Sequence, residues 1–401
     1  MRTAVIAIAL LTAIAVAIAV MLVVPRLAEP GAPRLEAEAS LLAMMAAAPD
    51  DFETVVAIPT FASTWRRFSP LIEPLLDSRE DERSLAAASW LIGNAPVAIW
   101  TSGGAWGALA RPDPLHRIAL RIANPFVPVD LRIEGDLVRF GPEVAAASQA
   151  IDPSLVRTLE GHLFILHGAK GSYPPMERPA LTALRFGDGV LRITSRGRAK
   201  DGASSAPPAL LGARTLPSNA LLAARFAEPP RAVLAMEKTA PIRFERLLGE
   251  GAMVALYGVE EGGLIPRPLI AFSVPADDAT YRDLVGAVDR AMAKGAVGLL
   301  LGPQPETTRT AGDVTITHRE GLGLTLEYAR RGDELLFAFD DGSVEQLLRA
   351  REISVGTGSA IWSMRARPAE LLPALEELGS SRGLRLLARG FSNAARDLAR
   401  A

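Results

Sequence analysis

One string in the chain has the form of a serine hydrolase motif. Residues Gly379–Gly383 read GSSRG and match G-x-S-x-G, which would make Ser381 a nucleophile. A nucleophile elbow requires a strand before the serine and a helix after it. Here residues 368–378 (PAELLPALEEL) are typical of a helix, and residues 384–390 (LRLLARG) are typical of a strand. The context therefore predicts that Gly379 ends a helix, and a serine hydrolase remains only a remote alternative function.

The four histidines do not form a metal-binding pattern. His162 and His167 lie five residues apart in a predicted strand, and side chains at an odd spacing point to opposite faces of a strand. His116 and His318 stand alone beside predicted strands, with no spacing typical of a zinc site. We expect His116 and His318 at the surface or rim of the fold, and the sequence predicts no metal and no cofactor.

Paired carboxylates offer groups for acid–base catalysis or calcium binding. Glu260–Glu261, Asp277–Asp278 and Asp340–Asp341 each fall at a predicted turn or helix start, where carboxylates accept hydrogen bonds from free backbone amides. None of the pairs belongs to an EF-hand pattern. Residues 167–172 (HGAKGS) also lack the first glycine of a phosphate-binding P-loop. The sequence therefore predicts no catalytic residues and a non-enzymatic protein.

The tryptophans are unevenly distributed along the chain. Four lie in the first third, and only Trp362 lies in the second half. We expect Trp90 and Trp100 to fill a core and Trp65, which precedes two arginines, to cover it. Trp106 lies in the glycine-rich string SGGAWG and is the strongest candidate for an exposed binding side chain. Trp106 and Trp65 are thus the predicted residues of an interaction surface.

Composition excludes several classes of partner. The chain has 43 Lys and Arg against 45 Asp and Glu, so it lacks the basic excess of a nucleic-acid-binding protein. It contains no cysteine, which excludes disulfides, thiolate nucleophiles and the lipid-attachment cysteine of a bacterial lipoprotein. Hydrophobic residues make up 49% of the chain but aromatic residues only 5%, so the cores must consist mostly of aliphatic side chains.

The N-terminus carries the strongest signal in the sequence. Residues 4–24 contain no charge, and as a helix they would span about 30 Å of hydrocarbon. A cleavable signal peptide has a shorter apolar region, and its first plausible cleavage site here, at 37–39, lies far downstream. We therefore predict that residues 1–25 are a retained transmembrane anchor of the bacterial inner membrane. The short N-terminal tail favours a cytoplasmic N-terminus and a periplasmic C-terminal region.

The rest of the chain divides by composition. Residues 26–48 combine proline with mixed charge and are predicted to form a stalk linker. Residues 49–199 and 218–401 show the same order of strand-like and helix-like segments, which predicts two related halves. Residues 200–217 are rich in Gly, Ala, Ser and Pro and are predicted to link them.

The best-matched unit of the two halves is a hairpin followed by a helix. Gly135–Asp136 and Gly332–Asp333 each lie between alternating strand-like runs, as in a tight hairpin turn. A helix is expected to begin at Pro142 in the first half and at Ser343 in the second, where Gln346 would complete a capping box. The predicted fold class is α+β, an N-terminal transmembrane helix followed by two halves, each an antiparallel sheet with helices on one face.

An N-terminal anchor, duplicated strand-rich halves and this hairpin–helix unit resemble a family of bacterial membrane-anchored proteins of unknown function. The resemblance implies an extracytoplasmic location and a duplicated architecture, and it carries over no site residues. The leading hypothesis is a non-enzymatic anchored module, a scaffold or subunit of an envelope complex whose partners are the membrane and envelope proteins. The alternative is a carrier or sensor of an apolar ligand such as a lipid, which the high aliphatic content would suit.

Overall fold

The protein is described by a computed structural model. Within the described residues, no helix is both long enough and apolar enough to cross a bilayer. The predicted anchor at 4–24, most of the predicted linker at 200–217 and Ser381 lie outside the described residues. The described residues are 32–49, 51–72, 88–102, 105–124, 130–141, 151–168, 179–197, 215–226, 252–260, 267–276, 278, 281–282, 285–286, 306–321, 324–338, 340–354 and 360–380.

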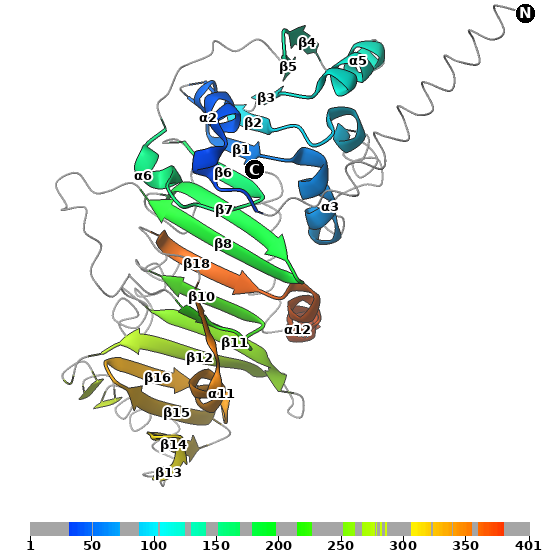
Figure 1. The fold of residues 1–401 in the computed structure, drawn as a ribbon. Helices are drawn as coiled ribbons and strands as arrows, with labels where there is room; N and C mark the ends of the chain where they lie inside the picture. Colours follow the sequence, from blue (N-terminus) through cyan, green and yellow to red (C-terminus); the bar gives the residue numbers. More distant parts are fainter. Residues whose placement is uncertain are drawn as a thin grey trace, which may run out of the picture. The chain divides into compact units, whose positions relative to one another are not determined.

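The predicted fold class is wrong. Sixteen strands join one large antiparallel sheet with few helices, where the sequence predicted two separate sheets with helices on one face of each (Figure 1). The physical reason is visible in residues 335–338, which are apolar and buried at every position. A strand of this kind is buried on both faces, so it needs cover on both sides and not on one.

The chain divides into two compact units. Unit 1 comprises Met1–Ser172, Ala180–Gly187 and Arg396–Ala401, and unit 2 comprises Tyr173–Pro179 and Asp188–Ala395.

Unit 1 contains seven of the described strands. Their order in the sheet is β7-β6-β1-β2-β3-β5-β4. The strands are β1 (Thr54–Ile58), β2 (Val97–Ser102), β3 (Ala105–Ala110), β4 (Leu131–Glu134), β5 (Leu137–Phe140), β6 (Leu163–His167) and β7 (Pro179–Gly187). The helices are η1 (Leu35–Ala37), α2 (Ala39–Ala46), α3 (Phe61–Ile72), α5 (Pro114–Ala123) and α6 (Pro153–Val156).

Both faces of the unit 1 sheet are covered. On one face, Leu41 and Met45 of α2 pack with Val55 and Trp100 in a single core cluster. On the other face, Ile58 packs with the start of α3 and with the helical residues 88–92. Residues 32–48, which the sequence assigned to a stalk, thus include η1 and α2 with buried side chains.

Unit 2 contains the other strands of the sheet, in the order β13-β14-β15-β16-β12-β11-β10-β18-β8. They are β8 (Val190–Gly197), β10 (Leu222–Phe226), β11 (Met253–Glu260), β12 (Arg267–Pro275), β13 (Glu306–Ala311), β14 (Val314–Gly321), β15 (Leu324–Arg331), β16 (Glu334–Ala338) and β18 (Ala360–Ala366). A separate two-stranded sheet pairs β9 (Thr215–Pro217) with β17 (Glu352–Ser354), and the helices are α11 (Ser343–Arg349) and α12 (Pro368–Ser380).

A row of alanines crosses one face of the unit 2 sheet. Ala223, Ala255, Ala271 and Ala338 are direct partners on four successive strands. They belong to the same buried cluster as Val344 and Leu347 of α11. Because alanine has the shortest apolar side chain, this row allows α11 to pack close to the sheet.

The predicted hairpin turns are confirmed. Gly135 and Gly332 occupy the turns between β4 and β5 and between β15 and β16, with φ of 63° and 59°. Glycine adopts this left-handed conformation without a Cβ penalty. The helix start at Ser343 is also confirmed, since α11 begins there, while Pro142 lies outside the described residues. The predicted capping box is replaced by the Asp340 carboxylate, which accepts a hydrogen bond from Ser343 N at 3.0 Å.

Candidate interaction surface

The two tryptophans predicted to form an interaction surface lie on different elements of unit 1. Trp106 is the second residue of β3, opposite Thr101 of β2, and it is 47% exposed. Trp65 lies on α3 and is half-buried. Trp100 is buried, as expected, and its ring contacts Gly107, where a Cβ would approach the ring to 2.7 Å. Trp90, which we expected in the core, is exposed.

Helix α5 presents a second apolar surface that the sequence analysis missed. Asp113 caps the helix, because its carboxylate accepts hydrogen bonds from Leu115 N at 2.9 Å and His116 N at 3.0 Å. Pro114 occupies the first turn, where its missing amide hydrogen is not needed. His116 and Leu120 face inward, and the exposed hydrophobic side chains on the outward side are Leu115, Ile118 and Ile122.

His116 fixes α5 to the neighbouring segment. Its Nδ1 lies 2.7 Å from Asp113 Oδ2, and its ring contacts Gly93, where a Cβ would lie 2.5 Å from Nε2. Burial alone would raise the pKa of Asp113, but hydrogen bonds from the backbone and ring of His116 lower it below its ordinary value. An Asp–His pair also occurs in hydrolases, but here Nε2 is buried without a hydrogen-bond partner in the described residues. Through this pair and the ring's contact with Gly93, the start of α5 is fixed to residue 93, a contact that we call the His116 latch.

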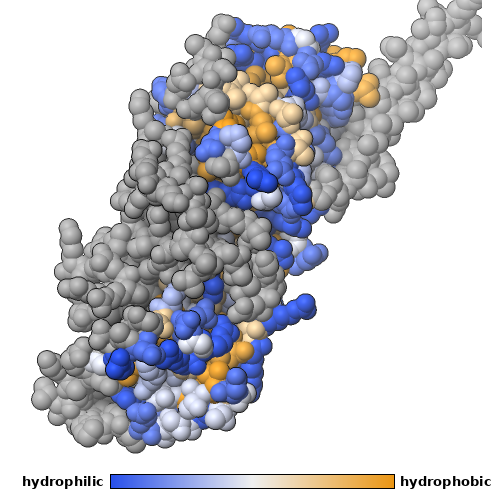
Figure 2. Space-filling view, turned by 60° about the vertical axis from the view of Figure 1, so that its left-hand side comes forward, coloured by the Kyte–Doolittle hydropathy of each residue, from blue (hydrophilic) through white to orange (hydrophobic). Residues whose placement is uncertain are grey.

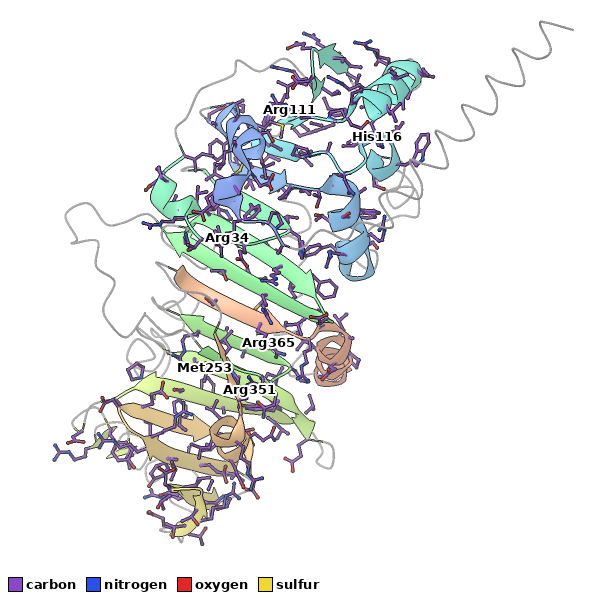
Figure 3. The ribbon with its side chains drawn as sticks, viewed as in Figure 1. Arg34, Arg111, His116, Met253, Arg351 and Arg365 are labelled. Atoms are coloured by element: carbon purple, nitrogen blue, oxygen red, sulfur yellow. The ribbon has the colours of Figure 1, made fainter. Side chains whose placement is uncertain are left out.

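The exposed Trp90 belongs to the helical residues 88–92, which lead directly into Gly93 and its contact with His116. Leu91 also packs against the cluster that contains Leu120. Figure 3 shows Arg111 just before α5 and His116 within it. Figure 2 shows hydrophobic residues at the surface of unit 1 among hydrophilic ones. We call the four exposed side chains Trp90, Leu115, Ile118 and Ile122 the α5 surface.

Unit 2 contains a cluster of groups that could coordinate a cation. Ligand atoms of His318, Glu327 and Asp341 lie within 4.8 Å of one another. Glu327 has no exposed surface; burial raises its pKa above the ordinary value, although a hydrogen bond from Gly342 N and the charge of Arg309 act in the opposite direction.

Arg309 already supplies the positive charge of this cluster. Its guanidinium lies 2.6 Å from Glu327 and 2.7 Å from Asp341. A divalent ion would have to displace this side chain or accept a cation as its neighbour, and both are electrostatically unfavourable. We therefore interpret the cluster as a charge network that ties α11 to β13, β14 and β15.

Sequence reasoning missed the charge network because its members come from four separate segments. The residues share a face only through the hairpin register, in which His318 is opposite Glu327 and Arg309 is opposite Ile316. A prediction of the β13–β14 hairpin would have brought Arg309 and His318 together and so indicated this network.

The expectation of a surface or rim position is wrong for His116, which is buried, while His318 is partly exposed. His162 and His167 are buried as well. His167 Nε2 lies 3.1 Å from Thr182 Oγ1, and His162 Nδ1 accepts a hydrogen bond from Phe186 N at 3.3 Å. Burial lowers the pKa of His167 to about 4, and burial together with Arg67 and Arg185 lowers that of His162 to about 4. Both rings are therefore neutral packing groups at pH 7.

No family model, curated protein or solved structure matches this chain. The resemblance to a membrane-anchored bacterial family therefore stays a prediction from the sequence.

Proposed function

We propose that the chain is a non-enzymatic, membrane-anchored extracytoplasmic module, a scaffold or subunit of a bacterial envelope complex. Residues 4–24 would anchor it in the inner membrane with the N-terminus in the cytoplasm, and the folded units would lie in the periplasm. Its chemistry is binding: the described groups best suited to catalysis have structural partners, since Asp113 caps α5 and Glu327 pairs with Arg309.

The observation that carries the proposal is the exposed indole of Trp106. It lies on β3, which pairs with β2 at Trp106 itself, opposite Thr101, and with β5 from Ala108 onward, so the ring is carried by a strand held within the sheet. Rigid, exposed tryptophans are favoured at protein interfaces because they bury a large area at a small entropic cost. The partner we propose for Trp106 is an apolar side-chain cluster of a second envelope protein.

The test is co-purification of the full chain, tagged after Ala401, from the native membranes. We expect a stoichiometric protein partner with the wild type and with Trp106→Phe, and its loss with Trp106→Ala. A partner that Trp106→Ala retains, or the absence of any partner, would contradict the proposal. Bound lipid in place of a protein would instead indicate the carrier function. A reporter fused after Ala401 should be active in the periplasm, and cytoplasmic activity would overturn the orientation.

A further inference from the structure

Exposed hydrophobic side chains of the described residues are concentrated at one place. Six large hydrophobic side chains are exposed in the part of the chain that the structure describes; three of them lie on α5, and Trp90 lies on the helical segment whose Leu91 packs with Leu120 of α5. Leu115, Ile118 and Ile122 are 48%, 53% and 68% exposed and lie three and four residues apart, so they share one side of the helix. Scattered exposed leucines are ordinary, but a concentration of this kind indicates a binding surface.

The helix that carries this surface is held in place before any partner binds. The Asp113 carboxylate caps its first turn, the His116 ring rests on Gly93, and Leu120 is buried in a small core cluster. Figure 1 draws α5 at the margin of unit 1. The side of α5 that carries His116 and Leu120 packs on the rest of unit 1. The opposite side, with Ile118 and Ile122, therefore faces outward.

The charges on α5 favour an anionic partner. The helix Pro114–Ala123 contains Arg117 and Arg121 and no carboxylate. Arg117 donates a hydrogen bond to Gly135 O at 3.1 Å, and Arg121 is exposed in the last turn. An amphipathic helix with an apolar side, flanking arginines and a neighbouring tryptophan suits the interface of an anionic bilayer, where its apolar side chains enter the boundary between headgroups and acyl chains.

The short segment between the predicted anchor and unit 1 indicates that the nearest partner is the lipid bilayer. The apolar segment ends at Val24, and the described part of unit 1 begins at Ala32, where Arg34 pairs with Glu160 at 3.1 Å. The seven intervening residues span at most about 25 Å when fully extended. If residues 4–24 cross the bilayer, the start of unit 1 at Ala32 stays within that distance of the lipid surface, so the tethered unit meets lipid at a high effective concentration.

We propose that the α5 surface docks on the anionic lipid surface of the same membrane that holds the anchor. This inference rests on the anchoring part of the proposed function. Ile118 and Ile122 would insert among the lipid headgroups, Trp90 would lie at the interface, and Arg117 and Arg121 would contact lipid phosphates. Unit 1 would then be held in one orientation relative to the membrane, which a single anchoring segment alone would not fix.

The cysteine-free sequence allows a direct test in the full chain. Ile122→Cys carries an environment-sensitive fluorophore, and the labelled protein is inserted into vesicles of phosphatidylglycerol and phosphatidylcholine that contain nitroxide-labelled lipid. The matched control is Ala43→Cys, an exposed position on α2, which packs on the opposite face of the unit 1 sheet. We expect a blue shift and nitroxide quenching at 122 and neither at 43.

A second substitution and a flotation assay separate the possible failures. Ile118→Glu should abolish quenching at 122 while the chain still floats with the vesicles, and Ala43→Glu should leave the quenching unchanged. Equal quenching at 122 and 43, or quenching that survives Ile118→Glu, would overturn docking but leave the anchor intact. A blue shift without nitroxide quenching would show that protein covers the surface and would also overturn it. A wild-type chain that fails to float would overturn both the docking and the anchoring.

Discussion

The guanidinium of Arg309 on β13 lies 2.6 Å from the carboxylate of Glu327 on β15, a side chain with no exposed surface. The other carboxylate oxygen of Glu327 accepts a hydrogen bond from Gly342 N at 3.0 Å, directly before α11. One buried carboxylate thus connects two strands and the start of a helix. A buried charge is costly without such partners, so the three groups depend on one another.

Substituting Glu327 by Gln should destabilise the protein by about 2 kcal/mol, because it removes a charge-assisted hydrogen bond and leaves Arg309 without its buried counter-ion. The measurement is the midpoint of urea unfolding. The matched control is Glu306→Gln, which breaks the exposed pair with Arg319. That pair is solvent-screened, so the control should lose less than about 1 kcal/mol. Equal losses would show that Glu327 is not a structural centre of unit 2.

The His116 latch gives a second prediction. Gly93 has φ of 66°, and a Cβ there would lie 2.5 Å from the imidazole of His116. Gly93→Ala should therefore cost about 1 kcal/mol for the left-handed backbone and about 2 kcal/mol more for overpacking.

Gly312 provides the control for this substitution, since it has the same φ of 66° and no atom within 4 Å of its would-be Cβ. Gly312→Ala should show only the backbone cost in thermal unfolding. If both variants lose the same stability, the His116 ring moves aside freely and does not fix α5.

An exposed tryptophan on β3, Trp106, and a buried one on β2, Trp100, should differ in their contribution to stability. Trp106→Ala should cost less than about 1 kcal/mol, because nearly half of the side chain is already in water. Trp100→Ala should cost about 3 to 5 kcal/mol, because the ring is buried and packs on Gly107. Chemical denaturation of both variants provides the comparison. A large loss from Trp106→Ala would assign that ring to the core and weaken its proposed role in binding.

Local turn chemistry was the part of the fold that the sequence could predict. The hairpins at Gly135 and Gly332 depend on a glycine between two alternating runs, and all the relevant residues are adjacent in the chain. The extent of the sheet depends on distant partners instead: Leu222 on β10 pairs with Ala366 on β18, and Ile193 on β8 pairs with Met364. No local pattern specifies such a pairing.

The candidate sites were harder to predict for a related reason. The α5 surface was missed because the sequence analysis placed His116 beside predicted strands and expected no helix at 114–123. Which side of this helix faces inward depends on distant contacts, since the buried His116 lies against Gly93 and Leu120 packs in a cluster with Leu131. The error for Trp90 arose because an apolar side chain was assumed to be buried.

The buried histidines of unit 1 predict a stability that depends on pH. Burial lowers the pKa of His167 from its ordinary 6.5 to about 4 in the folded state. Between these two values the unfolded chain binds more protons than the folded chain, so stability must fall as the pH drops from 6.5 to 4 and must change little from this group above 6.5. For His167 the loss between pH 7 and pH 5 should be about 2 kcal/mol.

The substitution His167→Gln isolates this contribution, because glutamine is neutral throughout the range and can still hydrogen-bond Thr182. Urea unfolding of wild type and variant at pH 7 and pH 5 gives two stability differences, and their change with pH cancels the contributions of all other titrating groups. His162, whose pKa is also lowered to about 4, should behave in the same direction when it is replaced by Gln. A wild type whose stability relative to His167→Gln is the same at both pH values would show that folding does not lower the pKa of this ring.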